Sequence, residues 1–383
     1  MSNSPLIHSG LILGIESSCD ETGAAVVRGG ANVLSNVITS QIGTHAPYGG
    51  VVPELASREH LQNIVPVVRT ALAQAGCGFY DLEAIAVTEG PGLAGALLVG
   101  VMYAKGLAFA LERPLIGVNH LEGHIHAVFL EAAKRQEQLA KPALALVVSG
   151  GHTHLYVAEE IDGAWCYKNV GKTVDDAAGE AYDKVAKLLG LGYPGGPWID
   201  WLAPHGDARA VAFGPVNVKQ KPYRAAREQS PRFLFSFSGL KTAVLRYVQT
   251  HTMAGQIEAR RQALAAIPGA SLQDALPLCD PETLGLIASF QHAVVEDLLR
   301  KTFAAAENFD CASIVVSGGV AANSELRRRF LSEGKKRGLP VLFPSLALST
   351  DNAAMIAAAA WPKLVAGNFA TALLSADPSL ALG

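Results

Sequence analysis

The fold is indicated by residues 11–27, LILGIESSCDETGAAVV. Two apolar runs flank a polar turn, and short apolar runs bounded by turn residues are typical of buried strands, so this stretch predicts a β-hairpin. The same order returns at residues 143–158, ALALVVSGGHTHLYVA, where a glycine turn joins the two runs. A hairpin pattern that occurs twice in the chain indicates an internal repeat of the same structural unit.

A second repeat supports this interpretation. Residues 84–98 read as a strand that delivers a glycine turn to a helix, and residues 313–330 have the same arrangement. Further strands are expected at 33–38 and 115–118, with a helix over 53–75 that has Pro in its first turn. Alternating strands and helices indicate mostly parallel sheets with helices on their faces. We therefore predict an α/β fold of two similar lobes that face each other across a cleft.

The segments between and after these repeats carry weaker signals. A helix is expected over 174–189, and an irregular polar tract over 203–232. Residues 250–280, rich in Ala, Gln and Pro, read as a loop with a short helix. The alanine-rich final helix, 352–365, is expected to pack on the first lobe.

One apolar helix has the length of a membrane span. Residues 92–111 match the ~20 residues that a span needs and contain a single charged residue, Lys105. Its many Gly and Ala residues, flanked by charged residues on both sides, suit a helix that is buried between a sheet and a second layer. We therefore predict a core helix and no membrane contact.

Composition narrows the class of protein. The chain has 383 residues, half of them hydrophobic, with 17% charged residues and a net charge of -3. These values indicate a compact protein long enough for two domains, and they argue against a generally basic protein that coats DNA. The five cysteines are scattered without a C-x-x-C pair, so neither a zinc ribbon nor a disulfide framework is expected. With no secretory signal apparent, a cytoplasmic location is predicted.

The strongest chemical signal is the stretch NHLEGHIHA at residues 119–127. On a helix, His120 and His124 lie on one face and can bind one metal ion, although a surface pair or a buried structural pair has the same spacing. Asp351, just before the final helix, is either a third ligand or the cap of that helix. In the zinc-protease motif H-E-x-x-H the base follows the first His directly; here Glu122 is one residue too late, so peptide hydrolysis is disfavoured.

Three glycine turns follow predicted strands, at residues 14 and 17–22, 149–151 and 317–319, and their distribution over two similar lobes favours a nucleotide in the cleft. Such turns expose backbone N–H groups that can bind the phosphate of a nucleotide. None matches a P-loop or a convincing Rossmann fingerprint. Asp176 and Asp183 are seven residues apart and would share one face of a helix, as a solvated stripe also would.

A series of motifs then identifies a resemblance that covers nearly the whole chain in order. They are residues 14–22 (GIESSCDET), 90–93 (GPGL), 119–124 (NHLEGH), 149–153 (SGGHT), 175–181 (DDAAGEA), 193–197 (YPGGP), 235–242 (FSFSGLKT), 318–323 (GGVAAN) and 350–355 (TDNAAM). The chain resembles the TsaD family of tRNA N6-adenosine threonylcarbamoyltransferases, once labelled O-sialoglycoprotein endopeptidases.

The resemblance implies an actin-like (ASKHA) fold with a first lobe at 10–119, completed by 348–383, and a second lobe at 120–347 with insertions near 203–232 and 250–280. It implies transfer of the threonylcarbamoyl group from threonylcarbamoyl-AMP to N6 of adenosine 37 in tRNAs that read codons beginning with A. It also implies two bacterial partners, a TsaB-like paralogue and a TsaE-like ATPase.

The residues that match the family's metal ligands are His120, His124 and Asp351, with Fe²⁺ the expected ion and Zn²⁺ the alternative. The matching substrate-binding positions are Val147, Val148, Ser149, Gly150, Gly151, Asp183, Gly196, Asp200 and Asn323. Asp20 and Glu21 are candidates for orienting substrate or tRNA, although they also suit a solvated turn.

Three other classes are weighed against this one. A small-molecule kinase or ATPase of the same fold would not need the histidine pair, and a metal-free paralogue should lack both the pair and Asp351. A metallopeptidase comes last. Basic runs at 327–329 and 335–337 could meet tRNA phosphates, but such runs are usually a solvated helix face.

Overall fold

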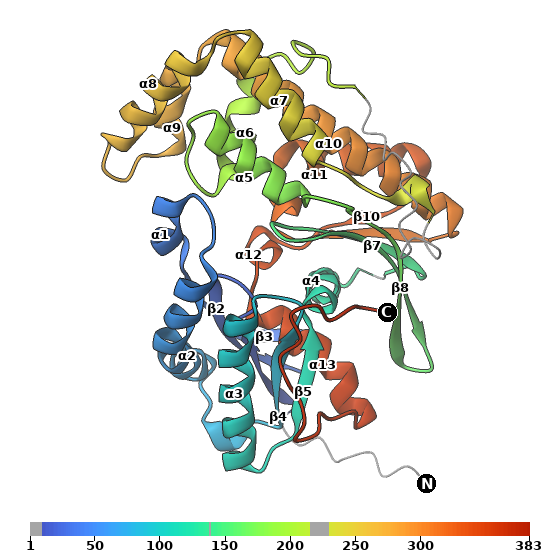
Figure 1. Cartoon of the computed structure of the whole chain (residues 1–383). Helices are drawn as coiled ribbons and strands as arrows, with labels where there is room; N and C mark the ends of the chain where they lie inside the picture. Colours follow the sequence, from blue (N-terminus) through green and yellow to red (C-terminus); the bar gives the residue numbers. More distant parts are fainter. Residues whose placement is uncertain (1–9, 138, 215–229) are drawn as a thin grey trace.

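The computed structural model describes residues 10–137, 139–214 and 230–383, which form two lobes, each built on a five-stranded sheet (Figure 1). The first sheet has the order β3-β2-β1-β4-β5, in which β1 is antiparallel to β2 and parallel to β4. Its strands are β1 (Leu11–Glu16), β2 (Glu21–Arg28), β3 (Asn32–Ser40), β4 (Ala84–Gly90) and β5 (Leu115–Asn119).

Helices cover both faces of this sheet. The elements on and around one face are α1 (Ile42–His45), η1 (Ala46–Tyr48), α2 (Pro53–Ala75), η2 (Phe79–Asp81) and α3 (Ala94–Leu111). Helix α13 (Ala353–Ala366), from the far end of the chain, packs on the other face as predicted. It lies so close to β1 that a Cβ on Gly14 would stand 2.3 Å from the carbonyl oxygen of Ala353, so only glycine fits there.

The second sheet repeats the first. Its order is β10-β9-β6-β7-β8, with β6 antiparallel to β7 and parallel to β9. Its strands are β6 (Ala143–Val148), β7 (Thr153–Ile161), β8 (Ala164–Lys172), β9 (Ser313–Ser317) and β10 (Val341–Leu342). The predicted α/β fold of two similar lobes is confirmed, while the edge strands β8 and β10 were not predicted.

The second lobe carries more helices than expected. They are α5 (Ala178–Leu188), α6 (Gly195–Leu202), η3 (Ala203–His205), η5 (Pro231–Phe233), α7 (Ser238–Thr250), α8 (Ala254–Ala265), α9 (Leu272–Ala275), η6 (Leu276–Leu278), α10 (Pro281–Asn308), η7 (Gly319–Ala322), α11 (Ser324–Arg337) and α12 (Leu346–Ser349). Residues 250–280 hold two α-helices instead of a loop with one short helix. Part of the predicted irregular tract, 215–229, lies outside the described residues.

The helix predicted over 174–189 begins later than expected, at Ala178. Asp175 does not continue it, because its side chain accepts hydrogen bonds from the backbone N–H groups of Phe237 and Ser238 at the start of α7. Asp176 is therefore not on the helix, and the prediction that it shares a helical face with Asp183 is wrong.

Helix α4 (His120–Lys134) lies between the two sheets. Leu121 and Ile125 pack with Ala145 and Val147 of the second sheet, whereas Ala127 packs with α13 and the first sheet. A boundary between lobes at residue 120 therefore stays a prediction, because the helix that starts there contacts both lobes.

Helix α3 is the apolar helix predicted to be buried. Among the described residues it is the one helix long and apolar enough, by length and composition, to cross a membrane. Its inner face packs against β4 and α2, but Leu98, Met102 and Phe109 are 52%, 56% and 88% exposed. The prediction of a second covering layer is wrong for this outer face.

Candidate metal centre and adjoining pocket

The histidine pair begins helix α4. Strand β5 ends at Asn119, whose side-chain oxygen accepts a hydrogen bond from the backbone N–H of Leu121 at 2.9 Å and so caps the helix. His120 is the first helical residue and His124 lies one turn later, both buried. Their rings are 4.7 Å apart between centroids, as the spacing predicted.

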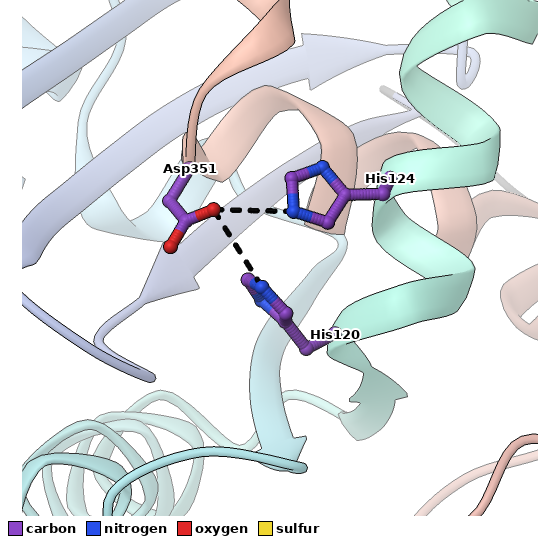
Figure 2. A group of neighbouring side chains, drawn as sticks. All are labelled: His120, His124 and Asp351. Carbon is purple, nitrogen blue, oxygen red and sulfur yellow. Dashed lines mark ion pairs between the residues drawn. The ribbon is translucent and has the colours of Figure 1, made fainter. Parts of the chain in front are cut away.

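Asp351 completes the group from a distant part of the chain (Figure 2). Its Oδ1 lies 3.6 Å from Nε2 of His120 and 3.1 Å from Nε2 of His124. The alternative that Asp351 caps the final helix is wrong, because the cap is Asn352, which accepts a hydrogen bond from the N–H of Met355 at 3.1 Å. Asp351 is thus free to face the histidines.

These three residues fit a divalent metal ion. Their potential ligand atoms all lie within 4.8 Å of one another. Nδ1 of His124 is buried without a hydrogen-bond partner among the described residues, and its Nε2 has only the ion-pair contact with Asp351 there. Leaving such buried atoms unsatisfied is costly. Two imidazoles and one carboxylate are a donor set that suits Fe²⁺ or Zn²⁺.

The electrostatics of the site also favour a cation. Burial alone would lower the pKa of His120, but the carboxylates of Asp351 and Glu16 raise it to about 9. Burial would raise the pKa of Asp351, but attraction to His120 and contact with His124 hold it well below its usual range. Surroundings that keep a proton on a buried imidazole would also stabilise a metal ion in its place.

Two further residues contact the ring of His120 on the side away from Asp351, and neither was predicted from the sequence. Glu16, the last residue of β1, is fully buried, and its Oε2 lies 3.1 Å from Nδ1 of His120. Ser18 Oγ is 3.2 Å from the same nitrogen. Both residues stand in the motif at 14–22, but only the fold brings that motif to α4.

The two catalytic candidates, Asp20 and Glu21, lie where the turn after β1 meets β2. Burial, together with the negative charges of Asp20 and Asp351, raises the pKa of Glu21 to about 9, so this carboxyl is protonated at neutral pH. His60 of α2 holds the turn, since its ring nitrogens bond to the carbonyl oxygen of Cys19 and to Oγ1 of Thr22. The alternative of a fully solvated turn does not fit this burial.

Glu122 does not belong to the group. Its carboxylate accepts a hydrogen bond at 2.8 Å from Nζ of Lys363 on α13. It is therefore an ion-paired structural residue, which agrees with the argument against a zinc-protease base.

Beside the cluster lies a cavity of about 740 Å³. Five of the predicted substrate-binding residues line it, namely Gly150, Asp183, Gly196, Asp200 and Asn323. Thr350, next to Asp351 in sequence, lines it as well, so the cavity adjoins the metal cluster. Apolar walls come from Trp201, Leu272 and Leu346.

The polar residues of the pocket are held in place. Oδ1 of Asp183 accepts a hydrogen bond from the N–H of Gly195 at 2.6 Å, and burial raises the pKa of this carboxyl to about 6. Asp200 accepts from the N–H and the hydroxyl of Ser324. Asn323 caps α11 and donates to Gln291 at 2.8 Å.

The other predicted positions contribute differently. Val147 and Val148 are fully buried in β6, so their side chains cannot reach the cavity. Ser149 is also buried, and its carbonyl oxygen accepts the N–H of Gly179 at 3.1 Å, which places the turn against the start of α5. A Cβ on Gly179 would lie 2.6 Å from that oxygen, so glycine is required for this approach. Gly151 is exposed.

His152 was not predicted as a site residue. Its ring centroid lies 6.1 Å from that of His120. Burial and the neighbouring imidazoles lower its pKa to about 3, so it stays neutral beside the cluster.

Most of the arginines in the basic runs of α11 form ion pairs or hydrogen bonds within the chain. Arg329 pairs with Glu296, and Arg337 pairs with Glu307 and Glu333. Arg327 donates to backbone carbonyl groups within its own lobe. This arrangement favours the interpretation of a solvated helix face over a tRNA-binding surface.

Comparisons with known proteins agree with this geometry. The family model described as "TsaD: tRNA N6-adenosine threonylcarbamoyltransferase" matches residues 32–358. A protein of that name from Koribacter versatilis is 62% identical over 376 residues, covering 97% of this chain and 99% of the relative. Its namesake from Clostridium perfringens strain SM101 is 48% identical over 373 residues, covering 97% and 98%.

A solved structure, full-length HypF in the phosphate- and nucleotide-bound form, aligns with a TM-score of 0.53 at 14% identity. The alignment covers 93% of this chain and 55% of HypF. At this identity the likeness concerns the fold alone, which is the actin-like ATPase fold.

Proposed function

The chain belongs to the family of tRNA N6-adenosine threonylcarbamoyltransferases, and we propose that its donor is threonylcarbamoyl-AMP and its acceptor is N6 of adenosine 37 in tRNAs that read codons beginning with A. It is a transferase that acts on tRNA. The observation that carries the proposal is the pocket of about 740 Å³ directly beside the His120, His124 and Asp351 cluster.

The pocket suits the adenosine part of the donor. Its apolar walls, including Trp201 and Leu272, would cover the base, and the carboxylates of Asp183 and Asp200 would accept hydrogen bonds from ribose hydroxyls. Gly150 and Gly319, which also line the pocket, leave room for a phosphate to approach the backbone. The threonylcarbamoyl group would then extend past Thr350 toward the metal ligands.

We propose that His120, His124 and Asp351 hold one divalent ion, with Fe²⁺ first and Zn²⁺ as the alternative. An ion bound there would supply Lewis-acid stabilisation for the negative charge that grows on the donor. The buried carboxylate of Glu16 and the neutral ring of His152 border this position.

In the proposed reaction the N6 amine of adenosine attacks the carbamoyl carbon. The new N–C bond forms, the C–O bond to the phosphate breaks, AMP leaves, and one proton leaves N6. Backbone N–H groups of the glycine turns stabilise the phosphate as it departs. Because Glu21 is protonated at neutral pH, we propose that it donates a hydrogen bond and that Asp20 is the candidate to accept the proton.

The partner proteins follow from the same family. We propose a TsaB-like paralogue and a TsaE-like ATPase, with the reaction in the cytoplasm. Helices α2 and α3 pack together and expose Leu61, Leu98, Met102 and Phe109. An apolar face of this kind is typical of a protein-binding surface, and we assign it to the paralogue.

The test is reconstitution. The protein, its two partners and threonylcarbamoyl-AMP are incubated with an unmodified tRNA that carries adenosine 37, and the nucleosides are analysed by mass spectrometry. The proposal predicts N6-threonylcarbamoyladenosine in this tRNA and none in the same tRNA with guanosine at that position. Phosphorylation of a small molecule from ATP, with no modified nucleoside formed, would favour a kinase of the same fold.

A further inference from the structure

Glu16 occupies a position where a carboxylate is costly to bury. It is the last residue of β1, its side chain has no exposed surface, and apolar strands surround it. The rest of β1 consists of Leu, Ile and Gly, as expected for a central strand. A buried charge that is not neutralised by specific partners would destabilise the fold by several kcal/mol.

Two partners of Glu16 donate hydrogen bonds, one to each of its oxygens. Its Oε1 accepts the backbone N–H of Ser18 at 2.6 Å, and its Oε2 accepts the hydroxyl of Thr88 at 2.7 Å. Nδ1 of His120 lies 3.1 Å from the same Oε2. Donors at both oxygens fix the carboxyl in its ionised form, which can only accept hydrogen bonds.

This arrangement determines the tautomer of His120. An ionised carboxylate repels a ring nitrogen that carries a lone pair, so Nδ1 of His120 must carry the hydrogen and donate it to Glu16. Ser18 Oγ, 3.2 Å from the same nitrogen, can accept a share of this hydrogen. When a metal ion takes the place of the second ring proton, the lone pair that binds it is on Nε2, the nitrogen that faces Asp351.

His124 provides the contrast. Its Nε2 lies 3.1 Å from Oδ1 of Asp351, but its Nδ1 has no hydrogen-bond partner among the described residues, so no residue behind the ring sets its tautomer. The two histidines that face Asp351 are therefore unequal, and only His120 is supported from behind.

We propose that Glu16 is a positioning residue that holds His120 in the tautomer and orientation required of a metal ligand. The inference rests on the proposed metal centre and deepens it. Carboxylates that accept a hydrogen bond from a ligating histidine fix the ring and raise its basicity, and their loss typically costs about 10–100-fold in metal affinity.

The experiment measures binding of Co²⁺ to the full-length, metal-stripped protein by competition with a chelator, together with the visible absorption spectrum of the bound ion. Glu16→Gln keeps the shape of the side chain but places an NH₂ group where Thr88, Ser18 or His120 already donates. We expect a roughly 10–100-fold loss of Co²⁺ affinity and a changed spectrum. Glu16→Asp, which keeps the charge but shortens the reach, should give a smaller loss and serves as the test if Glu16→Gln does not fold.

The matched control is Thr88→Val, which removes a hydrogen bond to Glu16 and leaves the contact between Glu16 and His120 in place. Its Co²⁺ affinity should stay within about threefold of the parent, because the variant loses one hydrogen bond to Glu16 but keeps the contact between Glu16 and His120. Folding of every variant is checked by thermal unfolding in the absence of metal.

The outcomes separate the two proposals. If the parent binds Co²⁺ and folded Glu16→Gln or Glu16→Asp binds it with the same affinity and spectrum, the positioning role is overturned while the metal centre stands. If Glu16→Gln loses only thermal stability, Glu16 is a structural residue and the inference is wrong. If the parent itself binds no Co²⁺, both the metal centre and the positioning role are overturned.

Discussion

The two hairpins that open the two sheets share a topology but differ in chemistry. Strand β1 ends in Glu16 and β6 ends in Val148, both fully buried, and each is followed by a four-residue turn. The first turn leads to the acidic pair Asp20 and Glu21, whereas the second, Ser149–His152, carries two glycines and no carboxylate.

This difference divides the cleft into two parts. The three proposed metal ligands lie on α4 and on the segment before α13, next to the first sheet. The pocket is lined almost entirely by second-lobe residues, among them Asp183, Gly196 and Asp200. Under the proposed function, the repeated fold supplies a frame in which α4 and the first lobe would hold the metal and the second lobe would hold the donor. The following predictions are designed to separate these functions.

The largest effect is expected for His124→Ala. Removing one of three ligands should lower Co²⁺ or Fe²⁺ affinity and threonylcarbamoyl transfer by more than about 100-fold, because even outer-shell losses cost up to that amount. The substitution also removes a buried nitrogen, Nδ1, that has no hydrogen-bond partner among the described residues, so the thermal midpoint of the metal-free protein should not fall sharply. Full transfer activity in the variant would refute the assignment of His124.

A substitution in the pocket should weaken adenosine binding and leave metal affinity unchanged. A Cβ on Gly196 meets no protein atom within 4 Å, so Gly196→Ala should leave the fold and the metal affinity unchanged. The added methyl group takes space from the donor and should weaken adenosine binding roughly 3–10-fold, or about 1 kcal/mol, measured by calorimetry.

Gly255→Ala is the matched control for that variant. This glycine also has open space around it but lies on α8, away from the pocket. Adenosine affinity should not change. If both variants weaken binding equally, the pocket has been placed wrongly.

A smaller effect depends on pH. Burial raises the pKa of Asp183 from its ordinary value to about 6, so the folded protein binds a proton that the unfolded chain releases. Its contribution to stability is therefore present below about pH 4 and is lost as the pH rises to 6. Asp183→Asn should become more stable than the parent over this window, by roughly 1–2 kcal/mol after discounting for partial exposure.

Urea unfolding between pH 4 and pH 7 measures this difference. A constant difference across the range would show that Asp183 does not titrate as a buried carboxyl.

The smallest effect concerns the residue next to a ligand. Asn352→Ala removes the cap of α13 and should lower the free energy of unfolding by about 1 kcal/mol. Asp351→Ala removes a ligand instead and should abolish metal binding without that loss of helix stability. If Asn352→Ala were the variant that abolished binding and Asp351→Ala were not, the roles of the two neighbours would be reversed.

Much of this could be predicted from local patterns. The strands at 11–16, 143–148 and 313–317 are continuous apolar runs, and the structure places them at those residues. The spacing of His120 and His124 depends only on helical geometry. These features require no knowledge of what packs against them.

The predictions fail where contacts between distant parts of the chain determine the local structure. Strand β8 is an edge strand whose outer positions are mostly exposed, and β10 has only two residues, so neither carries an apolar pattern. The start of α5 is set by contacts between Asp175 and the distant residues Phe237 and Ser238. Glu16 gained its partner because β1, β4 and α4 converge, which no spacing along the chain reveals.

The division of functions between the lobes is tested most directly by titrating adenosine into the metal-free parent and into His124→Ala by calorimetry. The account predicts dissociation constants that agree within about twofold, a difference of less than about 0.5 kcal/mol, because the pocket is built without His124. Loss of adenosine binding in a folded His124→Ala protein would show that the pocket and the metal ligands form one site, and would contradict the account.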